Sequence, residues 1–453
     1  MSLKDKHNFY FLGIGGIGMS ALARYFNAAG KFVAGYDLTE SPLTKQLVSE
    51  GIAVHYEDNV ALIPEQIKAD KDSLIIYTPA VPRGHRELNY LMDNGYSVKK
   101  RSQVLGDITK GAYTLAVAGT HGKTTTSTLI AHLLNQAGKD VSAFLGGIST
   151  DYSTNLLIGK NMESPVVVEA DEFDRSFLTL HPNLAIITSM DADHLDIYGE
   201  ATELEKSFRE FADNLHPSGK LFYKKGLPLE EDNRHFSYSI TEEADVMGTN
   251  VRIENAQYYF DLRLNGKEIK DLQLGIPGWH NVENAVAASA VVLEMGLTED
   301  ELRVGLVSFK GVKRRFEYII NTPDFVFIDD YAHHPTELAA CIGSVKNLYP
   351  GKIITGIFQP HLYSRTRDFA DGFAESLSLL DELILLDIYP ARESPIEGVT
   401  SDMILKKVTL QHKKVCSKQD LLEIMKDKKP EVLLTLGAGD IDRLITPLKE
   451  LYS

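Results

Sequence analysis

YTLAVAGTHGKTTTSTLIAHLLNQAG, residues 113–138, decides the fold of the chain. Its first seven residues form a short apolar run typical of a buried strand, and the residues after Lys123 continue as a helix that Gly138 would end. Between them lies a glycine loop, GTHGKTT. Loop N–H groups can surround phosphates, a lysine can reach the β- and γ-phosphates, and a threonine hydroxyl can bind Mg²⁺. The segment predicts a nucleotide-binding strand–loop–helix unit, although only two residues separate its glycines and the general P-loop pattern has four.

The same alternation of short apolar strands and helices extends in both directions from this unit. It predicts strands at 8–13, 31–37, 73–79, 164–171 and 184–193, and four more in DFVFIDD, KIITGIF, DELILLD and EVLLTLGAGD near the C-terminus. Around 235–275 the pattern becomes Tyr-rich alternation with an Asn265–Gly266 turn, which indicates a small antiparallel patch. We therefore predict an α/β protein with three consecutive α/β domains. These are a Rossmann-like domain at 1–107, a central P-loop domain carrying the antiparallel patch at 108–313, and a second Rossmann-like domain at 314–453.

Composition excludes several classes of protein. The 453 residues carry a formal net charge of −16, so a general role in nucleic-acid binding is not expected. Two cysteines cannot build a disulfide framework. No apolar run approaches 20 residues, and the N-terminus lacks a signal-peptide pattern. A cytoplasmic protein without membrane insertion, as a monomer or homodimer, is the expectation.

A second glycine pattern follows the first predicted strand. Small residues there let the backbone approach a phosphate, and the following helix begins with free N–H groups. Asp37 ends the next strand, where dinucleotide-binding folds often place a ribose-binding acid. The alternative is a tight strand–helix turn without a ligand. The candidate ligand-binding residues of this turn are Gly13, Gly15, Gly16, Ile17 and Gly18.

Clusters of acidic side chains follow the two later strands of the central domain. EADEFD begins at Glu169, and DADHLD, at 191–196, contains His194. Both predict side chains at the C-terminal edge of a parallel sheet, where ligands bind. Oxygen ligands near a phosphate site suit Mg²⁺. Surface loops are the alternative for about half of these acids, and Glu169 and His194 are the strongest candidates.

Three further patches carry polar groups. DDYAHHPT (329–336) and QPHLYSRTR (359–367) follow predicted strands, and arginine can bind a carboxylate through two hydrogen bonds. Zinc is not favoured, because adjacent histidines point apart on most backbones. In GWHNVEN (278–284), two asparagines three residues apart could contact a purine edge, with helix capping as the alternative.

Together these motifs resemble the Mur ligase family, in order and over essentially the whole chain. The matching segments are GTHGKTTT, EADE, DADHLD, GWHNVENA and DDYAHHPTE. GIGGIGMSALA, GVKRRFE and FQPHLYSRTRD are most similar to those members that add L-alanine to the lactyl carboxylate of UDP-N-acetylmuramate. The resemblance implies an ATP- and Mg²⁺-dependent amide ligase of peptidoglycan precursor synthesis, acting through an acyl phosphate.

The resemblance also implies a role for each matching residue. ATP would be bound by Gly119, Thr120, His121, Gly122, Lys123, Thr124, Thr125, Asn281, Asn284, Arg315 and Asp330. Metal would be held by Thr124, Glu169 and His194, alanine by Tyr331, His333 and Arg365, and the UDP-sugar by the 13–18 turn and Asp37. Lys123, His194 and His333 are the implied catalytic residues, the two histidines as candidates for the proton acceptor.

Two departures and three alternatives accompany this interpretation. Leu362 stands where many alanine-adding members carry arginine, and Ala332 replaces a glycine. One alternative is the ligase that attaches a murein tripeptide to UDP-N-acetylmuramate, although QPHLYSRTR is not expected there. A nicotinamide-dependent oxidoreductase would explain the glycine turn at 13–18 but would not explain GTHGKTTT. A catalytically silent nucleotide-binding protein would not need Lys123 and Glu169.

Overall fold

The computed structural model describes residues 3–173, 175–191, 198, 200–391 and 393–453. The chain forms two compact units. Unit 1 comprises 1–249, 261–272 and 283–309, and unit 2 comprises 250–260, 273–282 and 310–453. Three sheets, of five, ten and six strands, confirm the predicted α/β class. The boundary between the units passes through three strands of the ten-stranded sheet and through one helix.

The first sheet is entirely parallel, in the order β3-β2-β1-β4-β5. Three of its strands were predicted, whereas β3 and β5 are too short or too polar to form an apolar run. Its strands are β1 (Asn8–Leu12), β2 (Phe32–Tyr36), β3 (Ala53–His55), β4 (Leu74–Tyr77) and β5 (Ser97–Lys100). Its helices are η1 (Leu3–Asp5), α1 (Ile17–Ala28), α2 (Pro42–Ser49), η2 (Val60–Leu62), α3 (Glu65–Ala69), α4 (Arg86–Asp93) and α5 (Arg101–Lys110).

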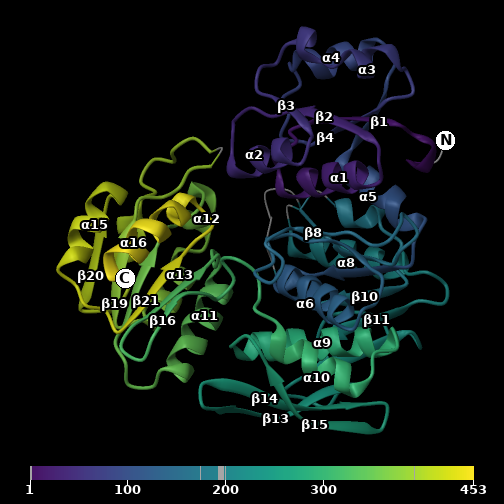
Figure 1. Ribbon diagram of the computed structural model, residues 1–453. Helices are drawn as coiled ribbons and strands as arrows, with labels where there is room; N and C mark the ends of the chain where they lie inside the picture. Colours follow the sequence, from purple (N-terminus) through teal and green to yellow (C-terminus); the bar gives the residue numbers. More distant parts are fainter. Residues whose placement is uncertain (1–2, 174, 192–197, 199, 392) are drawn as a thin grey trace. The chain divides into compact units, whose positions relative to one another are not determined.

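The two faces of this sheet have different neighbours. In Figure 1, α3 and α4 lie on one face, and α1 and α5 lie on the other. Tyr10 and Leu12 of β1 belong to the core under α3 and α4, while Phe9 and Phe11 belong to a larger core that continues into the central sheet. Alternate residues of β1 therefore serve two cores, as the two-residue repeat of a strand requires.

A buried polar link joins α1 to the central sheet. The side chain of Asn155 is fully buried and donates to the carbonyl oxygen of Ile17 at 2.5 Å. It accepts from Arg24 Nη1 at 2.8 Å, and Arg24 Nε donates to Glu50 at 2.7 Å. The central part of the chain thus holds the first turn of the helix that follows the 13–18 glycine turn.

The ten-stranded sheet has the order β15-β14-β13-β12-β11-β10-β6-β9-β7-β8. The predicted strand–loop–helix unit is present as β6 and α6, and Gly138 follows the helix with φ +67°. Its strands are β6 (Thr114–Ala118), β7 (Ser142–Phe144), β8 (Leu156–Leu157), β9 (Val166–Glu169), β10 (Leu184–Ile187), β11 (Lys220–Lys224), β12 (His235–Ser239), β13 (Val246–Glu254), β14 (Gln257–Leu264) and β15 (Lys267–Leu274). Its helices are α6 (Lys123–Gln136), η3 (Ser176–Thr179), α8 (Ala201–Asp213), α9 (Trp279–Glu294) and α10 (Glu299–Ser308).

The antiparallel patch begins later in the chain than the Tyr-rich texture suggested. Asn265 and Gly266 both have positive φ and join β14 to its neighbour β15, which confirms the predicted hairpin. However, β12 pairs in parallel with both β11 and β13, so 235–239 extends the parallel sheet. Aromatic alternation indicates strands but does not reveal their direction.

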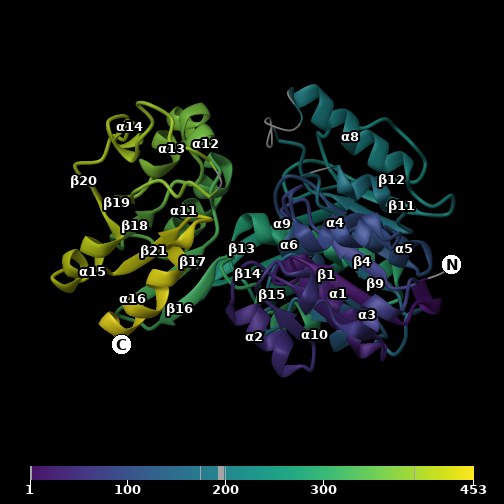
Figure 2. The same cartoon turned by 90° about the horizontal axis from the view of Figure 1, so that it is seen from above.

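The six-stranded sheet of unit 2 has the order β16-β17-β21-β18-β19-β20, with only β16 antiparallel. The four predicted C-terminal strands are β17, β18, β19 and β21. Figure 2 shows α15 and α16 on one side of this sheet and α11 to α14 on the other. The strands are β16 (Glu317–Asn321), β17 (Val326–Asp330), β18 (Ile354–Phe358), β19 (Glu382–Leu386), β20 (His412–Cys416) and β21 (Val432–Leu436). The helices are α11 (Pro335–Leu348), α12 (Tyr363–Asp368), α13 (Ala370–Leu377), α14 (Ser401–Leu405), α15 (Lys418–Lys426), η4 (Asp440–Leu444) and α16 (Ile445–Tyr452).

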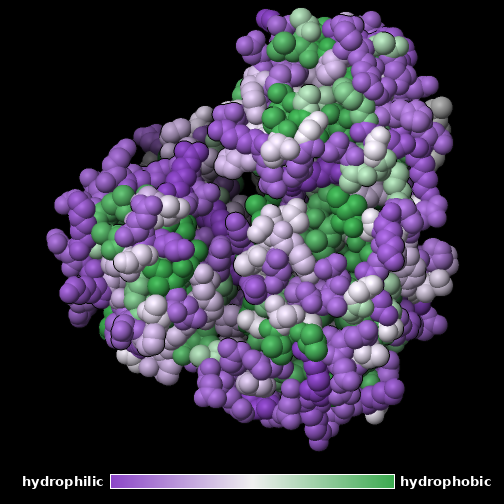
Figure 3. Space-filling view, in the orientation of Figure 1, coloured by the Kyte–Doolittle hydropathy of each residue, from purple (hydrophilic) through white to green (hydrophobic). Residues whose placement is uncertain are grey.

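The surface is mostly polar on the face shown in Figure 3, where hydrophobic residues appear in separate groups. Among the described residues, no helix is both long enough and apolar enough to cross a membrane.

A buried cluster of titratable groups lies on the α4 side of the first sheet. Tyr10 Oη donates to Glu87 at 2.6 Å and lies 2.7 Å from His55 Nε2. The N–H of Asn59 also donates to Glu87, whose side chain is fully buried. Burial raises the pKa of Glu87 to about 7. Burial lowers the pKa of His55, and of His85 on the same side.

Glu87→Gln is expected to stabilise the protein more at pH 8 than at pH 5. Folded Glu87 keeps its proton up to about pH 7, whereas the unfolded side chain releases it near 4.5, so this group's contribution to stability falls as pH rises through that window. At about 1.4 kcal/mol per pKa unit, the difference is on the order of 2 kcal/mol. Calorimetric Tm values of both proteins from pH 5 to 8 measure it. A Tm difference that stays constant across this range would contradict the assignment.

Candidate active site

The loop between β6 and α6 has the backbone that its glycines predict. Gly119 and Gly122 have φ of +131° and +80°. A Cβ on Gly122 would lie 2.8 Å from Asn284 Oδ1, and one on Gly119 would overlap Thr188 Oγ1. Both positions therefore need glycine for conformation and for space. The first turn of α6 begins directly after this loop, so its N–H groups are directed at whatever the loop holds.

Lys123 is the first residue of α6, and its ammonium group folds back over the loop. Nζ donates to the carbonyl oxygen of Gly119 at 2.7 Å and lies 2.9 Å from Glu172 Oε2. Burial lowers the lysine pKa, but the carboxylates of Glu172, Asp171 and Glu169 outweigh it, so the pKa is raised. The side chain is a permanent cation at the N-terminus of the helix.

Residues that follow β10 fix the other side of the loop. Ser189 Oγ accepts the N–H of His121 at 2.8 Å and lies 2.9 Å from Thr120 Oγ1. Thr188 Oγ1 hydrogen bonds to the carbonyl oxygens of Ala118 and His121. Sequence reasoning missed Thr188 and Ser189. Both lie inside the segment predicted as a strand, 184–193, whereas β10 ends at Ile187, so these two residues belong to the loop that follows it.

The acidic residues occupy the end of β9 as predicted. Glu169 ends the strand, and its carboxylate lies against Gly146, where a Cβ would overlap it. Glu172, treated as a weaker candidate in the sequence, is fully buried and is the partner of Lys123. Thr124 and Thr125 lie buried in the first turn of α6. His194 lies outside the described residues.

These groups fit a nucleotide with its magnesium. A helix N-terminus and a buried lysine suit phosphate, and the Thr124 hydroxyl and Glu169 carboxylate are oxygen donors of the kind Mg²⁺ prefers. Among the described residues, no three His, Cys, Asp or Glu side chains could hold a metal by themselves. Mg²⁺ typically takes one or two protein carboxylates and completes its shell with phosphate oxygens and water.

The two asparagines of α9 have separate surroundings. Asn284 packs against Gly122 at the phosphate loop, within unit 1. Asn281 Nδ2 donates to the carbonyl oxygen of Pro277 at 2.6 Å, within unit 2. This second contact is not a helix cap, in which the side-chain oxygen would accept a backbone N–H of the helix.

The N-terminal glycine turn is held largely by its own neighbours. The N–H groups of Gly13 and Ile14 donate to Tyr36 O, and that of Gly16 to Gly13 O. Asp37 Oδ2 accepts the N–H of Gly15 at 2.7 Å. Asp37 therefore shapes the turn in this structure. The N–H groups at the start of α1, from Ile17 onward, have no acceptor within the helix itself.

In unit 2, Asp330 ends β17 and organises the chain around it. Its carboxylate accepts the N–H groups of Phe316 and Ala332, each at 2.7 Å. Burial raises its pKa to about 6. Arg315 Cζ lies 5.0 Å from the centre of the Tyr331 ring, so these two predicted site residues are stacked. The neighbouring Arg314 also lies 5.1 Å from the centre of this ring, and it pairs with Asp329.

His333 has a defined tautomer. Nδ1 lies 3.0 Å from the carbonyl oxygen of Tyr331 and 3.3 Å from Glu337 Oε2. Both partners only accept, so Nδ1 carries the proton and Nε2 keeps its lone pair. Burial lowers the pKa of His333 to about 4. Glu337 also accepts the His333 N–H at 3.0 Å and lies 3.8 Å from Arg315, so it orients two predicted site residues. It was quoted in the sequence motif but not assigned a role.

The segment after β18 completes this group. Arg365 is buried, and its charge contributes to the lowered pKa values of both His333 and His361. Leu362, which stands in place of the expected arginine, has φ +69° and precedes α12. In unit 2 the rings of Tyr331 and His333 are 5.3 Å apart, and the charge of Arg365 acts on His333.

Comparison with known proteins decides the family. Three family models match in succession: "Mur ligase family, catalytic domain" at 8–113, "Mur ligase middle domain" at 117–292 and "Mur ligase, glutamate ligase domain" at 314–439. The chain belongs to the Mur ligase family. The oxidoreductase alternative has no support from these comparisons.

Within the Mur ligase family, the similar curated proteins cover essentially the whole chain. A UDP-N-acetylmuramate–L-alanine ligase of Flavobacterium psychrophilum is 51% identical over 99% of both chains. One of Porphyromonas gingivalis is 54% identical over 97% of this chain and 98% of its own. The crystal structure of UDP-N-acetylmuramate–alanine ligase from Thermotoga maritima matches with a TM-score of 0.82 and 28% identity, over 98% of this chain and 99% of that one.

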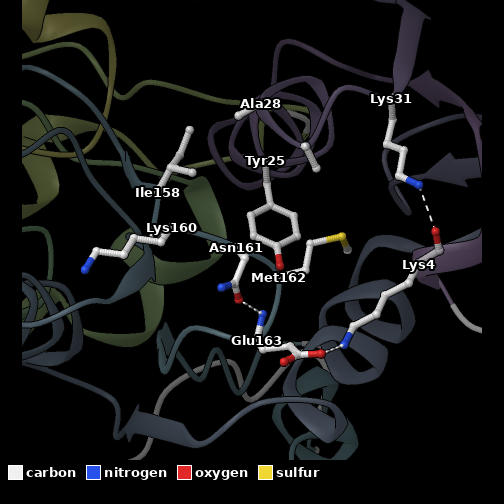
Figure 4. A pocket seen from close by; sticks show the side chains of 11 residues that line it. Lys4, Tyr25, Ala28, Lys31, Ile158, Lys160, Asn161, Met162 and Glu163 are labelled. Atoms are coloured by element: carbon white, nitrogen blue, oxygen red, sulfur yellow. Dashed lines mark hydrogen bonds and ion pairs between the residues drawn. The ribbon is translucent and has the colours of Figure 1, made fainter.

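A pocket at the opposite end of α1 contains none of the predicted Mur ligase residues. It has a volume of about 620 Å³, and Figure 4 shows Tyr25 projecting into it beside Met162. At its rim, Lys4 pairs with Glu163 at 2.8 Å, and Lys31 donates to the Lys4 carbonyl oxygen. Lys4 and Lys31 therefore already have partners in the protein.

Proposed function

We propose that this Mur ligase joins L-alanine to the lactyl carboxylate of UDP-N-acetylmuramate and converts ATP to ADP and phosphate. The observation that carries the proposal is the buried Lys123 cation, held over the glycine loop at the N-terminus of α6. Relatives about 50% identical over the full chain bear the name of this activity. Similar structures of murein peptide ligases at 23–24% identity support the fold alone.

The proposed reaction has two steps. The lactyl carboxylate attacks the γ-phosphorus of ATP, giving an acyl phosphate and ADP. The alanine amine then attacks the acyl carbon, phosphate leaves, and the amine proton passes to a base. Lys123 would neutralise charge on the transferred phosphoryl group. Thr124 and Glu169 would hold Mg²⁺, which supplies further charge neutralisation on the phosphate oxygens.

His333 is the base that the geometry of unit 2 favours. Its Nε2 keeps a lone pair because Nδ1 donates to the Tyr331 carbonyl oxygen. Tyr331 and Arg365 lie beside it, and the Arg365 guanidinium could bind the alanine carboxylate with two hydrogen bonds. Asp330 and Arg315 would contact the nucleotide from the same unit. The proposed site residues fall in three segments: 1–107 for the UDP-sugar, 108–313 for ATP and Mg²⁺, and 314–453 for alanine and further nucleotide contacts.

Phosphate release tests the proposed function. Purified protein with ATP, Mg²⁺ and UDP-N-acetylmuramate is expected to release phosphate when L-alanine is added, and mass spectrometry should find the alanyl product. The murein tripeptide and the other amino acids are assayed in parallel. Release with the tripeptide but not with alanine would assign the recycling activity instead. Because the reaction consumes ATP, we place it in the cytoplasm, with the protein as a monomer or homodimer.

A further inference from the structure

Arg101, the first residue of α5, lies against the N-terminal glycine turn. Its Nη1 is 2.9 Å, and its Cζ 3.3 Å, from the position that a Cβ on Gly18 would occupy. Gly18 has a negative φ, so its backbone conformation does not require glycine. The close approach of Arg101 does require it, because a side chain at 18 would displace the guanidinium.

The Arg101 guanidinium has no protein acceptor within the described part of the chain. Among the residues the structure describes, it makes no hydrogen bond or ion pair, although the side chain is only partly exposed. Arg24, also in unit 1, is by contrast bonded to Glu50 and Asn155. Arg101 shares a small cavity of about 10 Å³ with Glu169 and Asp171, yet forms an ion pair with neither. A guanidinium carries five donors, and leaving them without acceptors in a partly desolvated site is costly.

Most N–H groups of the glycine turn are not available to bind an anion, because they already have acceptors in the protein. The N–H groups of residues 13 to 16 are engaged by Tyr36, Asp37 and Gly13. The donors left for a ligand are those at the start of α1, beside Gly18. Arg101 adds a full positive charge at that same point.

We propose that Arg101 is a substrate-binding residue that holds the diphosphate of the UDP-sugar against the first turn of α1. This inference rests on the proposed function. Charge-assisted hydrogen bonds from the guanidinium complement the helix N–H groups, and the planar fork suits phosphate oxygens. It also accounts for the glycine at position 18, which lets the arginine approach the start of the helix.

Calorimetric titration with UDP and with uridine tests this role in the full-length protein. Arg101→Ala is expected to weaken UDP binding about 10- to 100-fold and to leave uridine binding unchanged, because only UDP carries the diphosphate. Arg101→Lys should retain part of the UDP affinity. ATP affinity should change by less than about twofold, since the phosphate loop is untouched. Lys110→Ala removes one positive charge from the other end of α5 and is the matched control.

Two results would overturn the inference. An equal loss of uridine and UDP affinity would show that Arg101 supports the turn without touching the diphosphate, and an unchanged UDP affinity would remove any role. If the Arg101→Ala variant does not fold, the ratio of UDP affinity to uridine affinity can be measured with the conservative Arg101→Lys variant. A failure of the proposed function would give a different result from a failure of the Arg101 inference. The wild-type protein would then bind UDP, with or without Arg101 dependence, but form no alanyl product.

Discussion

Lys123→Ala is expected to abolish formation of the acyl phosphate while leaving UDP binding within about twofold of wild type. The ammonium group is the buried cation at the phosphate loop, and its loss would leave Glu172 and Glu169 to repel the phosphates. Removing one preorganised charge partner of a transition state typically costs about 10²–10³-fold in rate. Hydroxylamine traps the acyl phosphate as a hydroxamate in the absence of alanine, so this step can be measured alone.

Lys139→Ala is the control for this substitution. Lys139 is exposed and follows the far end of α6, so its removal changes net charge equally without affecting the loop. Calorimetric titration with UDP and with ATP completes the comparison. If Lys123→Ala protein still gave hydroxamate at the wild-type rate, the role assigned to this lysine would be wrong.

His333→Asn is expected to give the opposite pattern. The asparagine amide can still donate to the Tyr331 carbonyl oxygen, but no nitrogen lone pair remains to accept the amine proton. Loss of a general base typically costs about 10²–10⁴-fold. We expect alanine-dependent turnover to fall by that factor while hydroxamate formation continues. His412→Asn, at an exposed histidine on β20, is the control.

The pH dependence adds a second measurement for His333. Its pKa is lowered to about 4 by burial, so the neutral, proton-accepting form persists well below the ordinary histidine range. The dependence of kcat/KM for alanine on pH should therefore show no histidine inflection near 6.5 and should lose this contribution only as pH approaches 4. If the hydroxamate rate and the alanine-dependent rate both fell in the His333→Asn variant, relative to wild type, His333 would have a purely structural role.

The sequence predicted those parts of the fold that are encoded locally. The strand, glycine loop and helix at 113–138 are contiguous, and positive φ at Gly119 and Gly122 follows from residue type. The predicted hairpin at Asn265–Gly266 has the same origin. By contrast, β5 has the sequence SVKK, which has too few apolar residues to indicate a strand, and only pairing with β4 reveals it.

The candidate site was predicted where one motif contains all partners, and missed where distant segments meet. Ser189 fixes a loop residue that lies 68 positions earlier, and no local pattern links the two. Glu172 was ranked below Glu169, because burial and pairing with Lys123 are not visible in a run of acids. Arg101 was not identified as a candidate, because four strands separate it from its spatial neighbour Gly18 in the sequence.

The hydrogen bond from Asn155 to Ile17 limits how this protein can be recombined with its relatives. Nucleotide-sugar specificity is often sought by exchanging an N-terminal module as a block. Exchanging residues 1–107 alone would separate α1 from the Asn155 amide that binds it. Arg24 would then lie against a residue of the other protein. A functional chimaera should therefore carry the short stretch around Asn155 together with residues 1–107, even though the two are separated by the entire phosphate-loop helix.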